Sequence, residues 1–200
     1  IIKYIDINRD SDNVKFYFDS LGPVYAKRLA QHKNEIWAFS RINGVFIEKD
    51  GEFRNITQKD STISKIVNDI CFDDSGYAYL AGNDGKIEIL APITRNKISE
   101  IHHDDHDYPI NWLEISRNKL FVGSSGVLRV YNLEDISNGN LSHQLYSQCE
   151  GYIVSGVNNS LLDNDGNILL ATNNGIVKIN TELFNEKKLK SIKTVIRRVD

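Results

Sequence analysis

The sequence predicts an all-β fold, a β-propeller built from four-stranded blades that recur about every 41 residues. Four short apolar strands each run into a turn that ends in glycine, and each is followed by a second apolar strand. The turn glycines are spaced by 41, 41 and 49 residues. About four to five such blades fit into 200 residues, so we interpret the chain as part of a larger propeller. The turn glycines are Gly44, Gly85, Gly126 and Gly175.

Each of these glycines closes a predicted hairpin. Asn-Gly and Asp-Gly pairs between apolar strands are strong hairpin signals, because both residues tolerate a positive φ. Three of the four turns carry such a pair, and Ser125-Gly126 is a weaker form of the same turn. The predicted hairpins cover residues 35–47, 77–90, 119–131 and 167–179.

A further strand precedes each hairpin. The segment 68–76 matches 158–166, since both contain an apolar strand and an Asp-x-x-Gly turn nine positions before the hairpin glycine. Segments 25–30 and 112–118 are the counterparts in the other two units. The fourth strands are more polar, as outer strands usually are. We expect them at residues 52–57, 97–101 and 142–146.

These repeats divide the chain into units. We expect a connector at 183–200, and the longer third interval reflects a loop near 132–140. The strand 14–18 is expected to be the last one of a blade that lacks its earlier strands. Because the sequence starts at Ile1 and contains no methionine, we expect it to be an excerpt of a longer chain. The predicted blade units are 14–24 (partial), 25–60, 61–107, 108–150 and 151–182.

Charge and composition argue against several classes of function. The 24 Lys and Arg residues against 27 Asp and Glu residues give a net charge of −3, which disfavours nucleic-acid binding. A membrane helix needs about 18 consecutive apolar residues, and the sequence contains no such stretch, so we expect no direct insertion into a membrane. The two cysteines form no spaced framework, and Cys71 is expected to be a buried apolar residue.

Two motifs contain metal-ligand types, and we expect neither to hold a metal. His102–Asp107 is dense in imidazole and carboxylate groups, but His103 replaces the Glu of an H-E-x-x-H motif and the segment falls in a predicted loop. Asp163–Gly166 looks like half a calcium loop, yet the same turn recurs at Asp73–Gly76, which indicates a structural turn. We therefore predict no metal, no cofactor and no catalytic residue.

Five residues are candidates for contact with a ligand. Trp112 begins a strand directly after a loop that contains Tyr108, so both are expected near a face of the propeller. Arg41 is an apparent insertion in the first hairpin, and Arg95 lies just past a strand end. His102 belongs to the histidine-rich loop. The other tryptophan, Trp37, falls on a repeated strand and is expected in the core.

The segment 163–176 resembles the two-component regulator propeller repeat, which reads roughly D-x-x-G-x-(I/L)-W-(I/L)-(G/A)-T-x-x-G-(L/I). Trp37 keeps the tryptophan of the repeat, and Tyr79, Leu120 and Leu169 replace it in the other units. The resemblance implies the extracytoplasmic sensor region of a bacterial hybrid two-component system histidine kinase, of the kind that senses glycans in gut Bacteroidetes.

Further expectations follow from this resemblance, which covers about residues 25–180. In the family, an immunoglobulin-like sandwich follows the propellers, and the tail 189–200 resembles the strand that leads into it. The resemblance implies a non-catalytic, periplasmic region that binds a small molecule or oligosaccharide, here a saccharide. It also implies contacts with neighbouring propeller and sandwich domains of the same chain, and allows a homodimer.

Two other functions stay open at this stage. Propellers also carry lyases and glycosidases, which need acid and base residues that converge on a channel or face. The His102–His106 cluster is the only hint of such an enzyme. A protein–protein interaction scaffold would bind a protein partner or itself and no small molecule.

Overall fold

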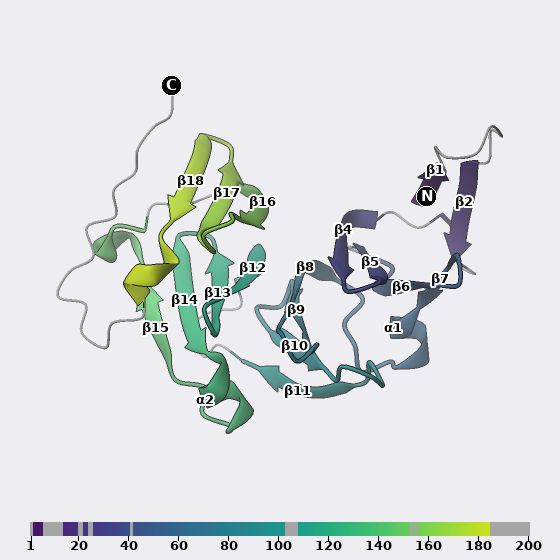
Figure 1. Cartoon of the computed structure of the whole chain (residues 1–200), viewed down its shortest axis with the longest axis horizontal. Coiled ribbons are helices and arrows are strands. Elements are labelled where there is room, and N and C mark those ends of the chain that lie inside the picture. The colour runs from purple at the N-terminus through teal and green to yellow at the C-terminus, as the bar shows by residue number, and fades with distance from the viewer. Residues whose placement is uncertain are drawn as a thin grey trace.

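The computed structural model describes residues 2–5, 14–19, 22–23, 26–40, 42–102, 108–152, 154 and 156–184. These residues form five antiparallel sheets that follow one another along the chain (Figure 1). Three of the sheets have four strands and two have three. The predicted all-β fold of repeated four-stranded sheets is therefore confirmed.

Within each sheet, strands that follow one another in the sequence also pair with one another. The first sheet contains β1 (Ile2–Ile5), β2 (Val14–Asp19) and β3 (Gly22–Pro23). The second contains β4 (Ala26–His32), β5 (Glu35–Ser40), β6 (Val45–Lys49) and β7 (Glu52–Asn55). The third contains β8 (Val67–Phe72), β9 (Ala78–Gly82), β10 (Ile87–Leu90) and β11 (Lys97–Ile101). The fourth contains β12 (Trp112–Ser116), β13 (Lys119–Ser124), β14 (Val127–Asn132) and β15 (His143–Tyr146), and the fifth β16 (Val157–Leu162), β17 (Ile168–Thr172) and β18 (Gly175–Ile179).

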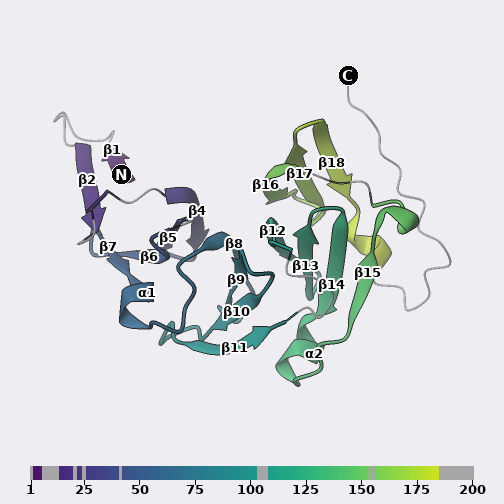
Figure 2. The same ribbon diagram turned by 180° about the vertical axis from the view of Figure 1, so that it is seen from behind.

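The sheets are arranged as the blades of a propeller. The first strand of each sheet from the second onward lies innermost, and β4, β8, β12 and β16 contact one another in succession. The other strands extend outward from this centre in both opposite views (Figures 1 and 2). Side chains of the four inner strands therefore meet although they are far apart in the sequence.

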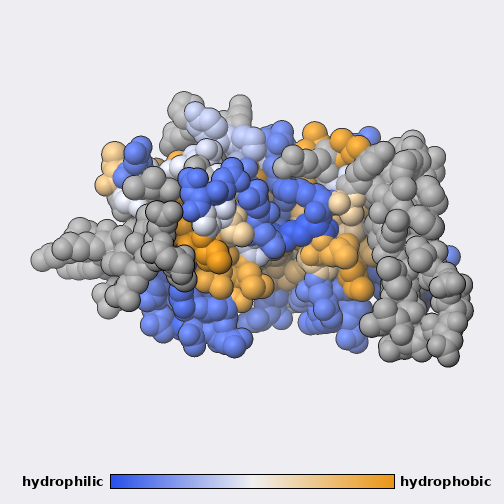
Figure 3. Space-filling view, turned by 90° about the horizontal axis from the view of Figure 1, so that it is seen from above, coloured by the Kyte–Doolittle hydropathy of each residue, from blue (hydrophilic) through white to orange (hydrophobic). Residues whose placement is uncertain are grey.

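Apolar side chains fill the space between adjacent sheets. Trp37 and Cys71 are both buried, as the sequence predicted. A fully buried side chain of this kind contributes about 2–3 kcal/mol to folding. On the face seen in Figure 3, the remaining apolar surface lies in patches between hydrophilic areas. The core includes Trp37, Phe39, Ile70 and Leu80 between the second and third sheets; Tyr79, Ile87, Leu113 and Val122 between the third and fourth; and Phe121, Ile168, Leu170 and Phe184 between the fourth and fifth.

The Asp-x-x-Gly turns are structural, as predicted. The Asp163 Oδ1 atom accepts hydrogen bonds from the backbone N–H groups of Asp165 (2.9 Å) and Asn167 (2.8 Å). The backbone N–H of Gly166 donates to the Asp163 carbonyl at 3.0 Å. Gly166 has a φ of +76°, a conformation that glycine adopts without steric cost. The aspartate side chain therefore satisfies its own turn.

Three segments differ from the prediction. β2 lies between β1 and β3, so it is a middle strand and not the last strand of its sheet. The expected strand 52–57 ends at Asn55, whose side chain accepts from the Gln58 N–H at 3.1 Å and caps helix α1 (Ile56–Lys59). Asn132 caps helix α2 (Leu133–Ser137) in the same way, within the segment expected to be a loop.

The chain after β18 continues into a 3₁₀ helix, Thr181–Phe184, and another such helix covers Gln148–Glu150. Phe184 packs against Phe121 with ring centroids 5.3 Å apart, so this helix closes the core of the last two sheets. Of the expected connector 183–200, the residues after Phe184 lie outside the described ranges.

Candidate functional site

Four polar side chains meet at the propeller axis, one from each inner strand. Arg28, Asp69, Glu114 and Ser160 come from β4, β8, β12 and β16, and we name them the axial cluster. The Arg28 Nη1 atom lies 2.8 Å from Asp69 Oδ1, and its Nη2 atom donates to the Ser160 carbonyl at 2.7 Å. One guanidinium group therefore joins strands of three sheets. Two of the joined residues, Arg28 and Ser160, lie 132 residues apart in the sequence.

The repeat itself directs these side chains to the axis. Arg28 and Asp69 each follow an irregularity in the pairing of the inner strand, where one extra residue is inserted. β16 has the same irregularity before Asn159. Such bulges redirect the following side chains. The Asp69 Oδ2 atom accepts from the backbone N–H of Leu113 at 2.9 Å, so this carboxylate also binds β12.

The two acids of the axial cluster titrate abnormally. The Asp69 side chain is 1% exposed, and this burial raises its pKa against the opposing charge of Arg28. Burial also raises the pKa of Glu114 to about 7, although a hydrogen bond with Ser160 acts in the opposite direction. The charge of Asp69 raises the pKa of Glu114 further, whereas Arg28 lowers it. Glu114 therefore exchanges its proton near neutral pH, a property of many functional sites and of some structural networks.

A groove of about 640 Å³ opens between the third and fourth sheets. Its size lies within the range of roughly 300–1,000 Å³ that is usual for small-molecule sites. The turn between β8 and β9, the turn between β12 and β13, and helix α2 surround it. Its apolar lining contains Tyr79, Ile89, Ile115, Leu133 and Ile136, and its polar rim contains Asp73, Asp74, Arg117, Asn118 and Glu134.

Hydrogen bonds hold several rim residues in place. The Tyr79 hydroxyl donates to Asp73 Oδ2 at 3.2 Å, and burial raises the pKa of this hydroxyl well above its usual range. Asn118 Nδ2 donates to Glu134 Oε1 at 3.2 Å. The groove therefore has positioned acceptors around an apolar lining, an arrangement that orients a ligand with both apolar and hydroxyl surfaces.

The interface that contains the groove differs from its neighbours. Ion pairs cross between the second and third sheets (Arg28–Asp69, 2.8 Å) and between the fourth and fifth (Arg117–Glu182, 2.9 Å). Between the third and fourth sheets lies an apolar core, and the hydrogen bonds there include one from the Leu113 N–H to Asp69 and one from the Ile110 N–H to the Gly82 carbonyl.

Two of the predicted ligand residues serve the packing between sheets. Trp112 lies in the core instead of near a face, with 1% of its surface exposed. Its indole lies over Gly123, where a Cβ atom would overlap it. Arg95 Nη2 forms an ion pair with Glu35 Oε2 at 2.6 Å, and its guanidinium lies 5.1 Å from the Trp37 ring centroid.

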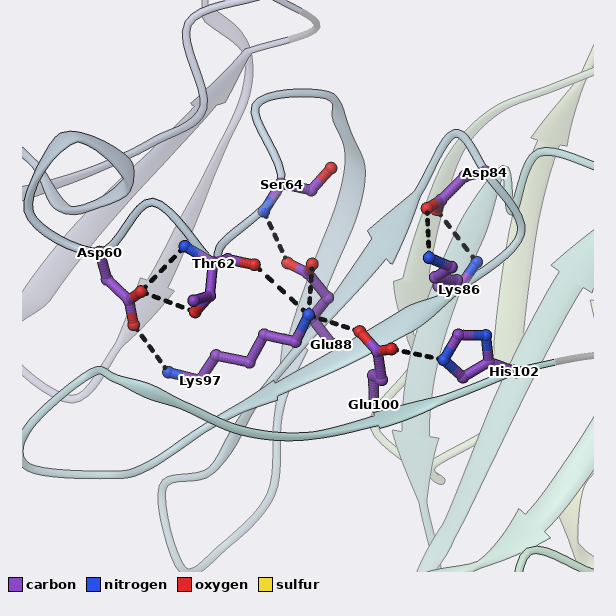
Figure 4. A network of polar contacts seen from close by, with 9 residues as sticks. All are labelled: Asp60, Thr62, Ser64, Asp84, Lys86, Glu88, Lys97, Glu100 and His102. Carbon is purple, nitrogen blue, oxygen red and sulfur yellow. Dashed lines mark hydrogen bonds and ion pairs between the residues drawn. The ribbon is translucent and has the colours of Figure 1, made fainter.

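His102 and Tyr108 lie at the surface. His102 bonds Glu100, which belongs with Lys97 and Glu88 to a polar network of the third sheet (Figure 4). Tyr108 is 54% exposed. Arg41 and the rest of the histidine-rich loop, 103–107, lie outside the described residues. Within the ranges that the structure describes, no three His, Cys, Asp or Glu side chains come together as a metal site would require.

Neither the groove nor the axial cluster contains Trp112, Arg95, His102 or Tyr108. Arg28 and Asp69 were not among the predicted site residues. A usable signal was present, because both are charged residues in inner strands and lie 41 residues apart, one repeat length.

The fold is similar to that of solved propellers. The chain matches the extracellular domain of BT4673 from B. thetaiotaomicron, described as a putative one-component system, with a TM-score of 0.60 and 16% identity over 84% of this chain and 22% of that one. A second structure of that domain, described as a putative hybrid two-component system, gives 0.59 and 16% over 82% and 21%. The WD40 propeller domain of Doa1 gives 0.54 and 13% over 72% and 46%.

At these identities the likeness shows the fold alone, and the chain spans less than half of the Doa1 domain and about a fifth of the BT4673 domain. No protein-family model and no curated protein matches the sequence. Among the described helices, none is long and apolar enough to cross a membrane.

Proposed function

We propose that this chain is the ligand-sensing propeller region of a bacterial two-component signalling protein, that it acts in the periplasm without catalysis, and that its ligand is a saccharide. The groove between the third and fourth sheets carries the proposal. The likeness to the BT4673 extracellular domain supports the signalling context.

The lining of the groove suits a sugar. A pyranose ring presents an apolar face of C–H groups and an edge of hydroxyl groups. The aliphatic and aromatic lining, which includes Tyr79, Ile89 and Ile115, would pack against the face. The carboxylate and amide groups of the rim, such as Asp73 and Asn118, would bond the hydroxyls.

The position of the groove suggests how binding is reported. A ligand that touches both sheets favours the arrangement in which its contacts with both are made, and it shifts the population only by that difference in affinity. The interface there has an apolar core, and apolar contacts permit small sliding motions. Asp69 bonds both β12 and Arg28, so a displacement of the fourth sheet would reach β4 and β16 through the axial cluster.

A pair of matched substitutions tests the proposal. Ile98 lines the groove and is 56% exposed, whereas Ile93 is 92% exposed and does not line it. Screening of oligosaccharides by thermal shift, followed by calorimetric titration, should identify ligands of the full chain. We expect Ile98→Ser to weaken their binding about tenfold, through loss of roughly 1–2 kcal/mol of apolar contact, and Ile93→Ser to leave it unchanged. Equal affinities for both variants, or no saccharide ligand at all, would contradict the proposal.

A protein-binding scaffold is the second candidate. The likeness to the Doa1 WD40 domain and large exposed apolar side chains such as Leu161 (63%) and Ile176 (65%) favour it. It predicts that Leu161→Ser reduces association with a protein or with a second copy while the saccharide screen stays negative.

A further inference from the structure

We propose that the groove selects uncharged or amino-bearing saccharides and rejects acidic ones, an inference that rests on the function proposed above. The charges at its rim carry the inference. Asp73, Asp74 and Glu134 place three carboxylates around one opening.

The donors that hold Asp73 and Glu134 are uncharged. Asp73 accepts from the Tyr77 backbone N–H at 2.9 Å and from the Tyr79 hydroxyl at 3.2 Å. Glu134 accepts from the Asn118 amide at 3.2 Å. These bonds fix the positions of the Asp73 and Glu134 oxygen atoms, and the groups that donate them carry no charge.

Arg117 is the only cationic side chain among the described residues that line the groove, and its Nε and Nη2 atoms bond groups of the turn before β17 and of the 3₁₀ helix after β18. Its Nη2 atom lies 2.9 Å from Glu182 Oε1 and donates to the Asp165 carbonyl at 2.8 Å. Its Nε atom donates to Thr181 Oγ1 at 3.1 Å. Arg117 is therefore paired with a carboxylate outside the groove.

Ligand chemistry follows from this distribution of charge. A carboxylate accepts hydrogen bonds from sugar hydroxyl groups, and more strongly from an ammonium group. A uronate or sulfate group in the same place offers no donor and meets like charges at close range. We therefore expect acidic oligosaccharides to bind at least about tenfold more weakly at low salt than neutral ones of equal length, with the difference shrinking as salt is added.

The test uses the full chain on an array of neutral, amino and acidic (uronate and sulfated) oligosaccharides, with titration of the hits. Besides the wild type, it includes the double variant Asp74→Asn/Glu134→Gln, which removes two rim charges. The matched control is Asp84→Asn/Glu52→Gln, which removes two charges outside the groove. We expect the rim variant alone to gain affinity for acidic oligosaccharides. The Ile98→Ser variant shows whether a given hit occupies the groove.

The outcomes separate the inference from the function on which it rests. Acidic oligosaccharides that bind the wild type as tightly as neutral ones, with loss of binding in Ile98→Ser, would overturn the inference and leave the saccharide function standing. An unchanged preference in the rim variant would also overturn it. Absence of binding to every class would contradict the proposed function, and the inference would fall with it.

Discussion

Arg28 and Asp69 occupy the same position in successive repeats, 41 residues apart, and their side chains form a 2.8 Å ion pair at the propeller axis. The pair is asymmetric, because the aspartate is 1% exposed and the arginine 29%. A buried carboxylate depends on its partner far more than a half-exposed guanidinium does.

Removal of this partner should destabilise the propeller strongly. We expect Arg28→Met to lower the free energy of unfolding by about 3 kcal/mol, since it leaves Asp69 buried without its counter-charge. The double variant Arg28→Met/Asp69→Asn should recover a large part of that loss, because an amide can still accept from the Leu113 N–H. Urea unfolding measures the free energy of unfolding of both variants. A value for Arg28→Met within about 0.5 kcal/mol of the wild type would show that the ion pair is dispensable.

The carboxyl group of Glu114, on β12, makes the stability of the fold depend on pH. The pKa of Glu114 is raised in the folded state from 4.5 to about 7, so the folded protein binds this proton more tightly than the unfolded chain does. The resulting stabilisation is complete below pH 4.5 and is lost as the pH rises through 7. We expect Glu114→Gln to flatten the decline between pH 5 and 8, and to be more stable than the wild type at pH 8 by at most about 3 kcal/mol. If the wild type and Glu114→Gln showed the same dependence of the urea midpoint on pH, the assignment of this pH dependence to Glu114 would be contradicted.

The close approach of Trp112 to β13 requires a glycine. A Cβ at position 123 would lie 1.9 Å from the indole Nε1, whereas a Cβ at Gly126 would meet no atom within 4 Å. We expect Gly123→Ala to destabilise the fold by about 3 kcal/mol through overpacking and to shift the tryptophan emission. Gly126→Ala should lower stability by only about 1 kcal/mol, from its φ of +71°. Thermal unfolding distinguishes the two, and equal losses would show that the indole can move aside.

The two thiols should react at very different rates. Cys71 is buried in the core between the third and fourth sheets, and burial raises the pKa of its thiol well above the usual value, whereas Cys149 is exposed. We expect a thiol reagent to label Cys149 at once, and to label Cys71 only when the interface between the third and fourth sheets opens. A bound saccharide should slow the second reaction. Rapid labelling of both thiols in the native protein would contradict the packing at this interface.

The repeats made the fold predictable, since hairpin turns and strand patterns are local properties of the sequence. The site was not predictable in the same way. The axial cluster forms only when residues as far apart as Arg28 and Ser160 are brought together by the ring of sheets. The groove depends on α2, which forms because Asn132 caps it in a segment whose composition indicated a loop. Trp112 was expected at a face because it follows a loop, but the sheet directs it inward over Gly123.

Hydrogen–deuterium exchange of the full chain, with and without a saccharide that binds it, tests the central claim most directly. If the groove between the third and fourth sheets is the ligand site, the ligand should slow exchange in segments 73–79, 115–118 and 133–139, which contain most of its lining residues. Exchange in the β10–β11 loop, residues 91–96, should stay unchanged. Protection confined to that loop or to other segments, with the groove residues unaffected, would contradict the account.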